Sequence, residues 1–369
     1  MYRTMKKSKA LVFYQYLPPW RVDIFNEMGK LYDLTIVFTD AECEGFTYNR
    51  QDLLNKLQNI NTVFLNNGFK IGNRPVRLGI LKLIRKHKPD IVFSHEYSPT
   101  SVLVALYKKL KMCSYKYYIT TSDNLEIAKA VNGAKSIARK FILNNSNGII
   151  VYSQNVKQWY QKKFPLLQVE VCPNIQNPQS LLSYRPQFEI IIKQNKEKYN
   201  IQDEIIILYI GRLVKIKGLD LLLNALSKVQ NKNFKLIIVG TGKEKKGLEE
   251  QAKILKIEEK VVFTGYSNGI ELYAWYDVAN FLILPSLYEP FGAVVNEALI
   301  YGCPVIASQY IGAVDFINSS NGIVFNPLKK DEFIKTLNIA FQKYPKRKRP
   351  AENLMPCTFN EYIKVFHKL

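Results

Sequence analysis

The sequence is poor in the residues that build disulfide frameworks and metal sites. Its 369 residues include only five cysteines and three histidines. The cysteines lie far apart rather than in paired spacings, at Cys43, Cys113, Cys172, Cys303 and Cys357. This pattern disfavours a disulfide-held scaffold and a zinc module. We therefore expect a reducing compartment and no bound metal.

Long apolar runs are also missing. The longest, such as EIIILYIG and FLILPS, fall far short of the roughly 20 residues that a membrane-spanning helix needs. The N-terminus, MYRTMKKSKALVFYQYLPP, is basic and then apolar. Its apolar part is short and lacks a small-residue cleavage site, so we interpret it as a β-strand and not as a signal peptide.

Acidic residues are scarce relative to basic ones. The chain has 52 Lys and Arg against 31 Asp and Glu, a net charge of +21. Residues 1–180 contribute +14 of this excess and residues 181–369 contribute +7. Such a surplus attracts nucleic acid, anionic lipid or phosphorylated ligands, and charge alone does not choose among them.

Apolar strand-like runs alternate with amphipathic helical patterns along the chain, as in KALVFYQY, WRVDIFNEMGKLY and DLTIVFTD. This rhythm predicts an α/β protein with parallel sheets covered on both faces. The rhythm breaks around residues 176–203 and then resumes. We therefore predict two Rossmann-like, doubly wound domains at 1–177 and 204–350 with a linker region at 178–203. An amphipathic C-terminal helix at 351–369 is expected to pack back toward the N-terminal domain.

The stretch LPSLYEPFGAVVNEALIYGCPVIAS holds two glutamates eight residues apart, Glu289 and Glu297. The pattern predicts a strand, a loop and a helix that ends at Gly302. The first amides of that helix, near Phe291, Gly292 and Ala293, are donors for an anionic or oxygen-rich ligand. Carboxylates suit the hydroxyls of a sugar. In isolation, Glu289 could instead be a first-turn acid and Glu297 a solvated one.

A second stretch, IIILYIGRLVKIKGLDLLLNAL, ends a buried strand at Gly211. Arg212 and Lys217 follow within a short loop before a helix. Two cations at a strand end, beside a helix N-terminus, indicate a diphosphate site. The alternative is a pair of solvated loop cations.

Together these stretches resemble the retaining GT-B glycosyltransferases of family four, which use nucleotide-sugars. The resemblance covers most of residues 204–327 and rests on the E-x7-E motif of Glu289 and Glu297 and on the G-R…K-G pair. It implies that Glu289 and the amides of Phe291, Gly292 and Ala293 hold the donor sugar. It further implies that Glu297 binds the ribose and that Gly211, Arg212 and Lys217 surround the diphosphate. Thr241 and Asp315 depart from the family pattern without touching these positions.

The first half resembles the family more loosely, as an acceptor domain would. Arg21, in the loop LPPWR, could face a phosphate. His95 ends the strand PDIVFSHE and is the candidate for the family histidine that contacts the donor sugar, although it could be a core residue. Asp123 and Asn124 end the next strand and are candidates for sugar binding.

The stretch RPVRLGILKLIRKHK predicts a basic amphipathic helix. Val76, Ile80 and Ile84 would share its apolar face, and cations such as Arg77 and Lys82 would lie elsewhere. It is either an ordinary packed helix or an interfacial patch toward anionic lipid.

We predict a GT-B enzyme whose domains face each other across a cleft. It would transfer a sugar, with retention, from a nucleotide-diphosphate sugar to a glycan or lipid-linked glycan during polysaccharide synthesis. The predicted catalytic residues are Glu289, Arg212, Lys217 and His95. We expect no cofactor, no nucleic acid partner, and a cytoplasmic place with peripheral contact to an anionic membrane. The alternatives are a GT-B nucleotide-sugar epimerase and a basic nucleic-acid-binding protein, for which no RRM, KH or zinc-finger signature is present.

Overall fold

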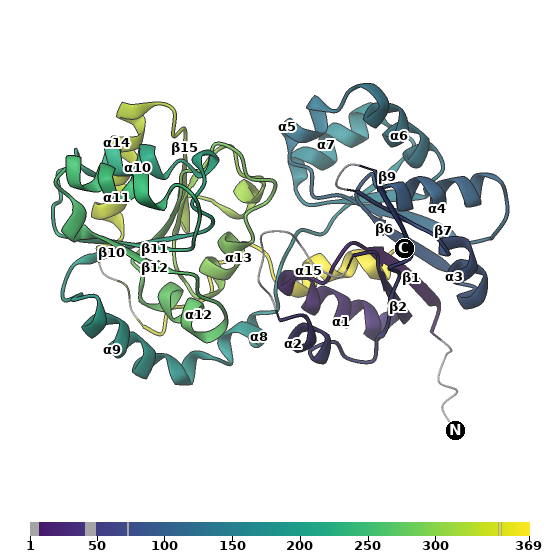
Figure 1. The fold of residues 1–369 in the computed structure, drawn as a ribbon, viewed down its shortest axis with the longest axis horizontal. Helices are drawn as coiled ribbons and strands as arrows, with labels where there is room; N and C mark the ends of the chain where they lie inside the picture. Colours follow the sequence, from purple (N-terminus) through teal and green to yellow (C-terminus); the bar gives the residue numbers. More distant parts are fainter. Residues whose placement is uncertain (1–6, 41–48, 72–73, 346, 348) are drawn as a thin grey trace. The chain divides into compact units, whose positions relative to one another are not determined.

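The computed structural model describes residues 7–40, 49–71, 74–345, 347 and 349–369 (Figure 1). These residues form two compact units. Unit 1 holds the chain up to residue 176 together with residues 359–369, and unit 2 holds residues 177–358. The chain therefore passes between the units twice.

Unit 1 is built on a parallel sheet of seven strands in the order β3-β2-β1-β6-β7-β8-β9. Its strands are β1 (Lys9–Tyr14), β2 (Asp33–Phe38), β3 (Asn61–Phe64), β6 (Ile91–His95), β7 (Lys116–Thr120), β8 (Gly148–Val151) and β9 (Gln168–Val171). The apolar part of the N-terminal stretch thus forms strand β1, as predicted. The direction of the strand order reverses between β1 and β6. Such a switch point is where open parallel sheets bind ligands, beyond the carboxyl ends of the strands.

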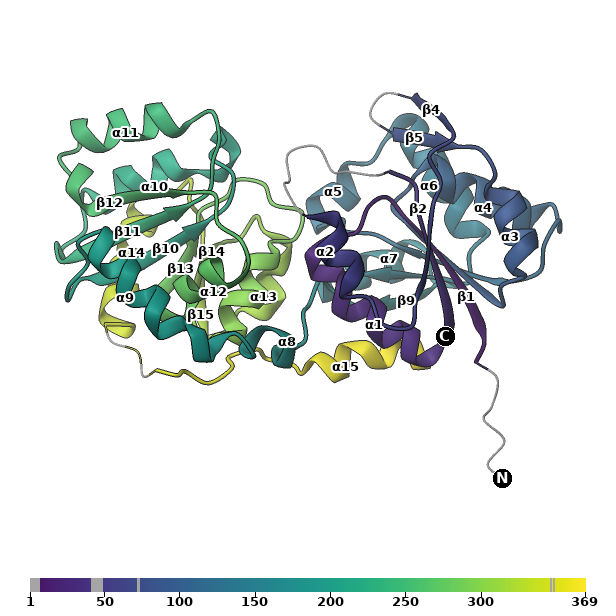
Figure 2. The same cartoon turned by 60° about the horizontal axis from the view of Figure 1, so that its bottom comes forward.

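Helices cover both faces of this sheet. They are α1 (Val22–Leu31), α2 (Arg50–Asn55), α3 (Ile80–His87), α4 (Pro99–Lys109), α5 (Leu125–Ala130), α6 (Gly133–Asn144), α7 (Gln154–Lys163) and α15 (Phe359–Ile363). Figures 1 and 2 show α1 and α15 on one face and α4 and α6 on the other. The end of the chain is tied to this unit because the Tyr32 hydroxyl donates a hydrogen bond to the carbonyl of Phe366.

The predicted basic helix starting at residue 74 is wrong in its first third. Residues Arg74–Arg77 form strand β5, which pairs antiparallel with β4 (Gly68–Ile71). Helix α3 begins only at Ile80, after Gly79 adopts a left-handed φ of +94°. Arg77 is therefore not on the helix, and its guanidinium donates hydrogen bonds to the carbonyls of Thr39 and Asn66.

Unit 2 contains a parallel sheet of six strands in the order β12-β11-β10-β13-β14-β15. Its strands are β10 (Ile205–Ile210), β11 (Phe234–Val239), β12 (Val261–Gly265), β13 (Phe281–Leu284), β14 (Val305–Ser308) and β15 (Gly322–Phe325). The helices are α8 (Pro178–Leu182), α9 (Phe188–Lys198), α10 (Leu219–Leu226), α11 (Lys245–Ile254), α12 (Gly269–Val278), α13 (Ala293–Ile300) and α14 (Lys330–Lys343). Figure 2 shows α10 and α11 on the opposite face of the sheet from α9, α12 and α13.

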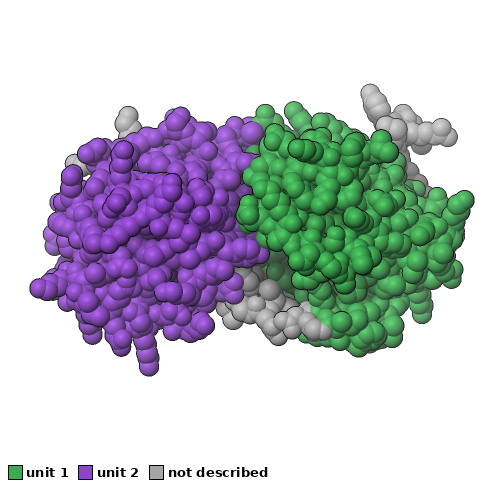
Figure 3. Space-filling view, turned by 90° about the horizontal axis from the view of Figure 1, so that it is seen from above, with its two compact units in different colours: residues 1–176, 359–369 green, residues 177–358 purple. Residues whose placement is uncertain are grey.

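Residues 178–203, which the sequence suggested as a linker region, fold as α8 and α9 and belong to unit 2, which Figure 3 draws in purple. Leu181, Phe188 and Ile192 are buried there. The side chain of Arg185 also forms an ion pair with Asp277 of α12 at 3.2 Å. Buried apolar side chains and an ion pair therefore hold a segment whose overall composition is polar.

Candidate active site

Two loops at the carboxyl ends of β10 and β13 lie against each other in unit 2. The amide of Leu287 donates a hydrogen bond of 2.8 Å to the carbonyl of Ile216. Gly218, at the end of the first loop, has φ of +68°, and a Cβ atom there would lie 2.4 Å from the carbonyl oxygen of Pro285. Glycine is needed at this position because a side chain would force the loops apart.

This close approach places Lys217 beside Glu289, and the two side chains form an ion pair. They are only 11% and 23% exposed, so water screens the pair weakly. The backbone of Glu289 is held in turn by a β-bridge to Ile311, and its carbonyl accepts a hydrogen bond from the amide of Gly312. These backbone contacts fix the position from which the carboxylate of Glu289 extends.

Arg212 belongs to the same group of charges. Its side chain is exposed, and its carbonyl accepts a 3.1 Å hydrogen bond from the hydroxyl of Tyr209 in β10. Burial raises the pKa of Tyr209, the negative charge of Glu289 adds to the rise, and the positive charge of Arg212 opposes it. Arg212 and Glu289 thus both lie close enough to Tyr209 to affect its pKa, and Lys217 is paired with Glu289.

Helix α13 begins next to this group, directly after Gly292, whose φ is +97°. The first amides of a helix have no intrahelical acceptor, and the helix dipole favours a negative charge there. The ring of Phe291 is buried against Phe316 at 5.7 Å and fixes this turn. The predicted helix, including Ala293 at its start and Gly302 just past its end, is confirmed.

Glu297 lies one turn into α13 and is only 8% exposed. The hydroxyl of Tyr276, from α12, donates a 2.7 Å hydrogen bond to its Oε2. Burial raises the pKa of Tyr276, and the charge of Glu297 raises it further, so the phenol remains a donor at neutral pH. The two predicted glutamates thus have different main partners, Lys217 for Glu289 and Tyr276 for Glu297.

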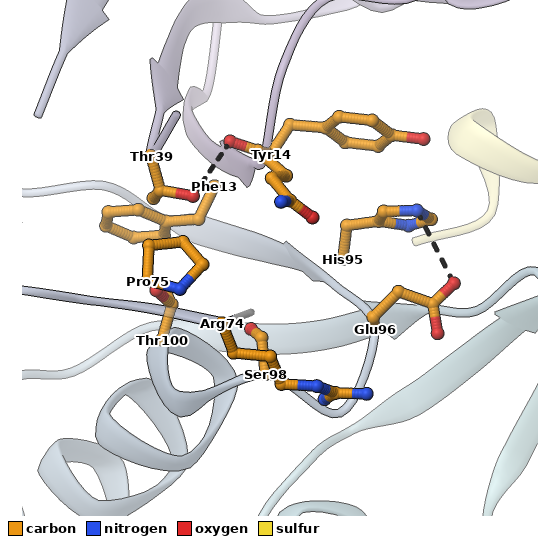
Figure 4. Close-up of a pocket in the computed structure, with 10 residues that line it drawn as sticks. Phe13, Tyr14, Thr39, Arg74, Pro75, His95, Glu96, Ser98 and Thr100 are labelled. Carbon is orange, nitrogen blue, oxygen red and sulfur yellow. Dashed lines mark hydrogen bonds and ion pairs between the residues drawn. The ribbon is translucent and has the colours of Figure 1, made fainter. Parts of the chain in front are cut away.

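The polar residues predicted in the first half gather at the carboxyl ends of β1, β6 and β7 in unit 1. A pocket of about 120 Å³ lies at the switch point between β1 and β6. Figure 4 shows the residues that line it. Its polar lining comes from Tyr14, Gln15, Thr39, Arg74, His95, Glu96, Ser98 and Thr100. A switch-point pocket of this kind is the expected place for a ligand.

His95 lies in this pocket with its ring stacked on Tyr14 at 4.1 Å. Its Nδ1 is 2.8 Å from the hydroxyl of Thr120, and its Nε2 is 3.5 Å from a carboxylate oxygen of Glu96. Burial lowers the pKa of His95 to about 4; Glu96 opposes this shift and Arg21 adds to it. The imidazole is therefore neutral at pH 7 and can donate or accept one hydrogen bond with a hydroxyl.

Arg21 is buried beneath the pocket. It is 3% exposed and donates hydrogen bonds to the hydroxyls of Tyr152 at 2.6 Å and Tyr14 at 3.3 Å. Arg21 therefore helps to hold Tyr14, the residue on whose ring His95 stacks.

Asp123 follows the next strand, β7, and is 8% exposed. Burial raises the pKa of Asp123 to about 7, the charge of Glu96 adds to the rise, and Arg139 opposes it. Its Oδ2 is buried and has no hydrogen-bond partner in the described part of the chain. Asn124, the neighbouring candidate, caps helix α5 by accepting a hydrogen bond from the amide of Ile127.

Comparison with known proteins finds a family model that matches part of the chain. The model of a family described as "Glycosyl transferases group 1" matches residues 191–354, which include Arg212, Lys217, Glu289 and Glu297. This segment is therefore similar to the group 1 glycosyl transferases. It spans most of unit 2 and extends from α9 to the segment that leads back to unit 1.

Several curated relatives of this segment and its flanks are named as glycosyltransferases. A glycosyltransferase of Methanocaldococcus jannaschii is 34% identical over 162 residues, which are 43% of this chain and 42% of the relative. The lipopolysaccharide 1,2-N-acetylglucosaminetransferase of Salmonella typhimurium is 27% identical over 68% of this chain and 67% of the relative. The matched segments thus span between about two fifths and two thirds of the length of these two relatives.

Solved structures establish the fold of the whole chain. HepE of Anabaena in complex with UDP-glucose superposes with a TM-score of 0.73 at 17% identity, over 98% of each chain. WaaG, a glycosyltransferase of lipopolysaccharide biosynthesis, superposes with a TM-score of 0.64 at 17% identity, over 97% of each chain. The fold is therefore GT-B, as the sequence predicted.

Two residues that contact the predicted site residues were not themselves predicted: Tyr276 in unit 2 and Glu96 in unit 1. Tyr276 has no sequence signal, because its contact with Glu297 joins residues of two helices. Glu96 carries a weak signal, since it is a polar residue directly after a buried strand. It adopts a left-handed φ of +59°, which a glutamate rarely does and which is common at functional sites.

Proposed function

We propose that this protein is a retaining, metal-independent glycosyltransferase that moves a hexose from a nucleotide-diphosphate sugar to a hydroxyl of a glycan or lipid-linked glycan. The observation that carries the proposal is the charged group of Arg212, Lys217 and Glu289, which lies beside the start of α13 in the segment that is similar to the group 1 glycosyl transferases. Two cations and a helix N-terminus suit a diphosphate, and a carboxylate beside them suits a sugar hydroxyl.

In the proposed reaction, the bond between the sugar C1 and the diphosphate oxygen breaks first. Arg212, Lys217 and the amides at the start of α13 stabilise the negative charge that develops on the departing diphosphate. The acceptor oxygen then bonds to C1 from the same face, and its proton passes to the departing diphosphate.

The remaining residues bind and orient the donor in this proposal. Glu289 accepts hydrogen bonds from the donor sugar, and Glu297, oriented by Tyr276, accepts them from the ribose. The neutral His95 contributes a hydrogen bond to the sugar. These roles of Glu289, Glu297 and His95 are proposals that follow from the resemblance and from the partners observed for each side chain.

The donor and acceptor classes are supported by similar proteins. HepE of Anabaena has been solved with UDP and with UDP-glucose, which favours a uridine nucleotide as the first donor to test. The Salmonella relative acts on lipopolysaccharide, which favours a role in the synthesis of a cell-surface polysaccharide. We therefore propose UDP-hexoses as the first donors and a lipid-linked glycan as the acceptor.

In the part of the chain that the structure describes, no helix has the length and apolar character of a membrane span. The positive charge of the first half, +14 in residues 1–180, favours reversible attraction to anionic lipid. We propose a cytoplasmic protein that contacts the inner face of the membrane through this charge.

A panel of nucleotide-sugars tests the function directly. Thermal shift would rank the donors, and slow hydrolysis of the best donor would show that its sugar–phosphate bond is activated. With an acceptor present, the anomeric configuration of the product, read from its proton coupling constants, distinguishes retention from inversion. Release of an isomerised sugar without any acceptor would point to an epimerase instead. Unchanged activity in EDTA is expected, and loss of activity restored by a divalent cation would contradict metal independence.

A further inference from the structure

Three arginines lie in or next to the pocket in unit 1. Arg74 lines it, Arg77 donates to the carbonyl of Thr39 in its wall, and Arg21 lies beneath Tyr14. Within the described residues, none of these three arginines forms an ion pair: their hydrogen-bond acceptors are backbone carbonyls and tyrosine hydroxyls. Lys217 in unit 2 differs, because Glu289 pairs with it.

Glu96 is the one carboxylate in the pocket lining, and its oxygens already have donors. One oxygen accepts hydrogen bonds from the amide and the hydroxyl of Ser122, at 2.8 and 2.6 Å, and the other accepts one from Thr121 at 3.2 Å. His95 is neutral and adds no charge at pH 7. In the lining itself, Arg74 and Glu96 carry opposite charges. Arg77 and Arg21 add positive charge just outside the lining.

The side chain of Arg74 is placed to meet a ligand in this pocket. It is exposed, and its Nη1 donates a 2.6 Å hydrogen bond to the carbonyl of Tyr97. In Figure 4 its guanidinium lies on the side of the pocket where Glu96 and Ser98 are drawn. An anchored guanidinium loses little freedom when it binds an anion, and its planar fork matches a carboxylate or a phosphate.

The pocket is small, with a volume of about 120 Å³. It has room for a small anionic group and the atoms next to it. The polar side chains of Gln15, Thr39 and Ser98 can bind neighbouring hydroxyls.

We infer that this pocket binds the anionic group, a phosphate or a carboxylate, of an acidic saccharide acceptor, and that Arg74 determines the preference for that charge. The inference rests on the proposed glycosyltransferase function and specifies the chemical class of its acceptor. The acceptor hydroxyl would belong to the same saccharide.

Binding to the pocket can be followed through the ring signals of His95. The chain has only three histidines, and of these His95 lines the pocket. The probes are inorganic phosphate, glucose 6-phosphate, glucuronate and glucose, each titrated at constant ionic strength with chloride as the balancing anion. We expect the anionic probes to shift the ring signals of His95 saturably in nuclear magnetic resonance spectra. The signals of His87 and His367 should stay in place, and glucose should have little effect.

Arg74→Gln should weaken binding of the anionic probes at least about tenfold, as expected for the loss of one charge-assisted pair. Arg85→Gln is the matched control, since it removes one exposed arginine from α3 in the same unit. Arg74→Lys should restore part of the affinity. A response to phosphate and glucose 6-phosphate alone would identify a phosphate-bearing acceptor, and a response to glucuronate alone a carboxylate-bearing one.

The inference is overturned if none of the anionic probes shifts His95 more strongly than glucose does, or if Arg74→Gln binds the anions as the wild type does. UDP binding is measured separately on the same variants and should not change. If the anionic probes fail to shift the His95 signals while UDP still binds, only the proposed acceptor class is refuted. Absence of binding by any nucleotide-sugar would instead refute the proposed function.

Discussion

The ion pair between Lys217 and Glu289 makes an unusual prediction for nucleotide affinity. In the structure the ammonium group of Lys217 is already held by a carboxylate. A diphosphate that binds Lys217 must therefore compete with Glu289. We expect Glu289→Gln, which keeps the shape and removes the charge, to bind UDP more tightly than the wild type while transferring sugar far more slowly.

The magnitude follows from the burial of the pair. Its side chains are 11% and 23% exposed, and hydrogen bonds to charged groups in such surroundings contribute about 1.5–3 kcal/mol. The diphosphate regains part of this interaction, so we expect at least about fivefold tighter UDP binding, or ~1 kcal/mol. Turnover should fall about 10²–10³-fold, as for the loss of one preorganised polar contact.

Isothermal titration calorimetry with UDP on four proteins measures this effect: the wild type, Glu289→Gln, Lys217→Ala and the double variant. Lys217→Ala should weaken UDP binding, and Glu289→Gln should give no tightening once Lys217 is absent. Weaker UDP binding by Glu289→Gln would refute the reasoning. So would a tightening that persists in the double variant, since Lys217 could not then be its cause.

Further perturbations test the other residues. Arg212→Ala should lower turnover about 10²–10³-fold, and initial rates within a factor of two of the wild type would contradict its role. Glu297→Gln should weaken UDP binding in calorimetry, and a loss confined to turnover would show that it does not bind the ribose. The pKa of Asp123 is raised to about 7 in the fold, so its contribution to stability is lost as pH rises from about 4 to 7. Asp123→Asn should therefore gain stability relative to the wild type at pH 8 compared with pH 5 in thermal unfolding; an equal difference at both pH values would contradict this. The protein should co-sediment with anionic vesicles at low salt and be released at 1 M salt, where the Debye length is about 3 Å; recovery in the supernatant at low salt would contradict membrane contact.

Strand positions were predictable from the sequence because parallel strands covered on both faces are continuous apolar runs. The loops at their carboxyl ends were predictable for the same reason, whereas a common site for Lys217 and Glu289 was expected only from the family resemblance. The hairpin of β4 and β5 was not, since its strands are short, mostly exposed and contain Pro75. Partners that come from separate elements, such as Tyr276 for Glu297, depend on the packing of helices and have no local pattern.

Helix α9 also was not predictable from the sequence as part of the second unit. Its composition is polar, and only Phe188 and Ile192 are buried. Tertiary contacts with α12, rather than an apolar stripe, identify it as part of unit 2. Composition alone therefore suggested a linker where the fold has a surface helix.

The most direct test of the central claim is a crystal structure of the protein with a bound nucleotide-diphosphate sugar. The account predicts that the diphosphate oxygens lie within hydrogen-bond distance of Lys217 and Arg212, next to the first amides of α13. It also predicts that Glu289 contacts the sugar and Glu297 the ribose. A diphosphate bound elsewhere, with the ion pair between Lys217 and Glu289 still closed, would contradict it.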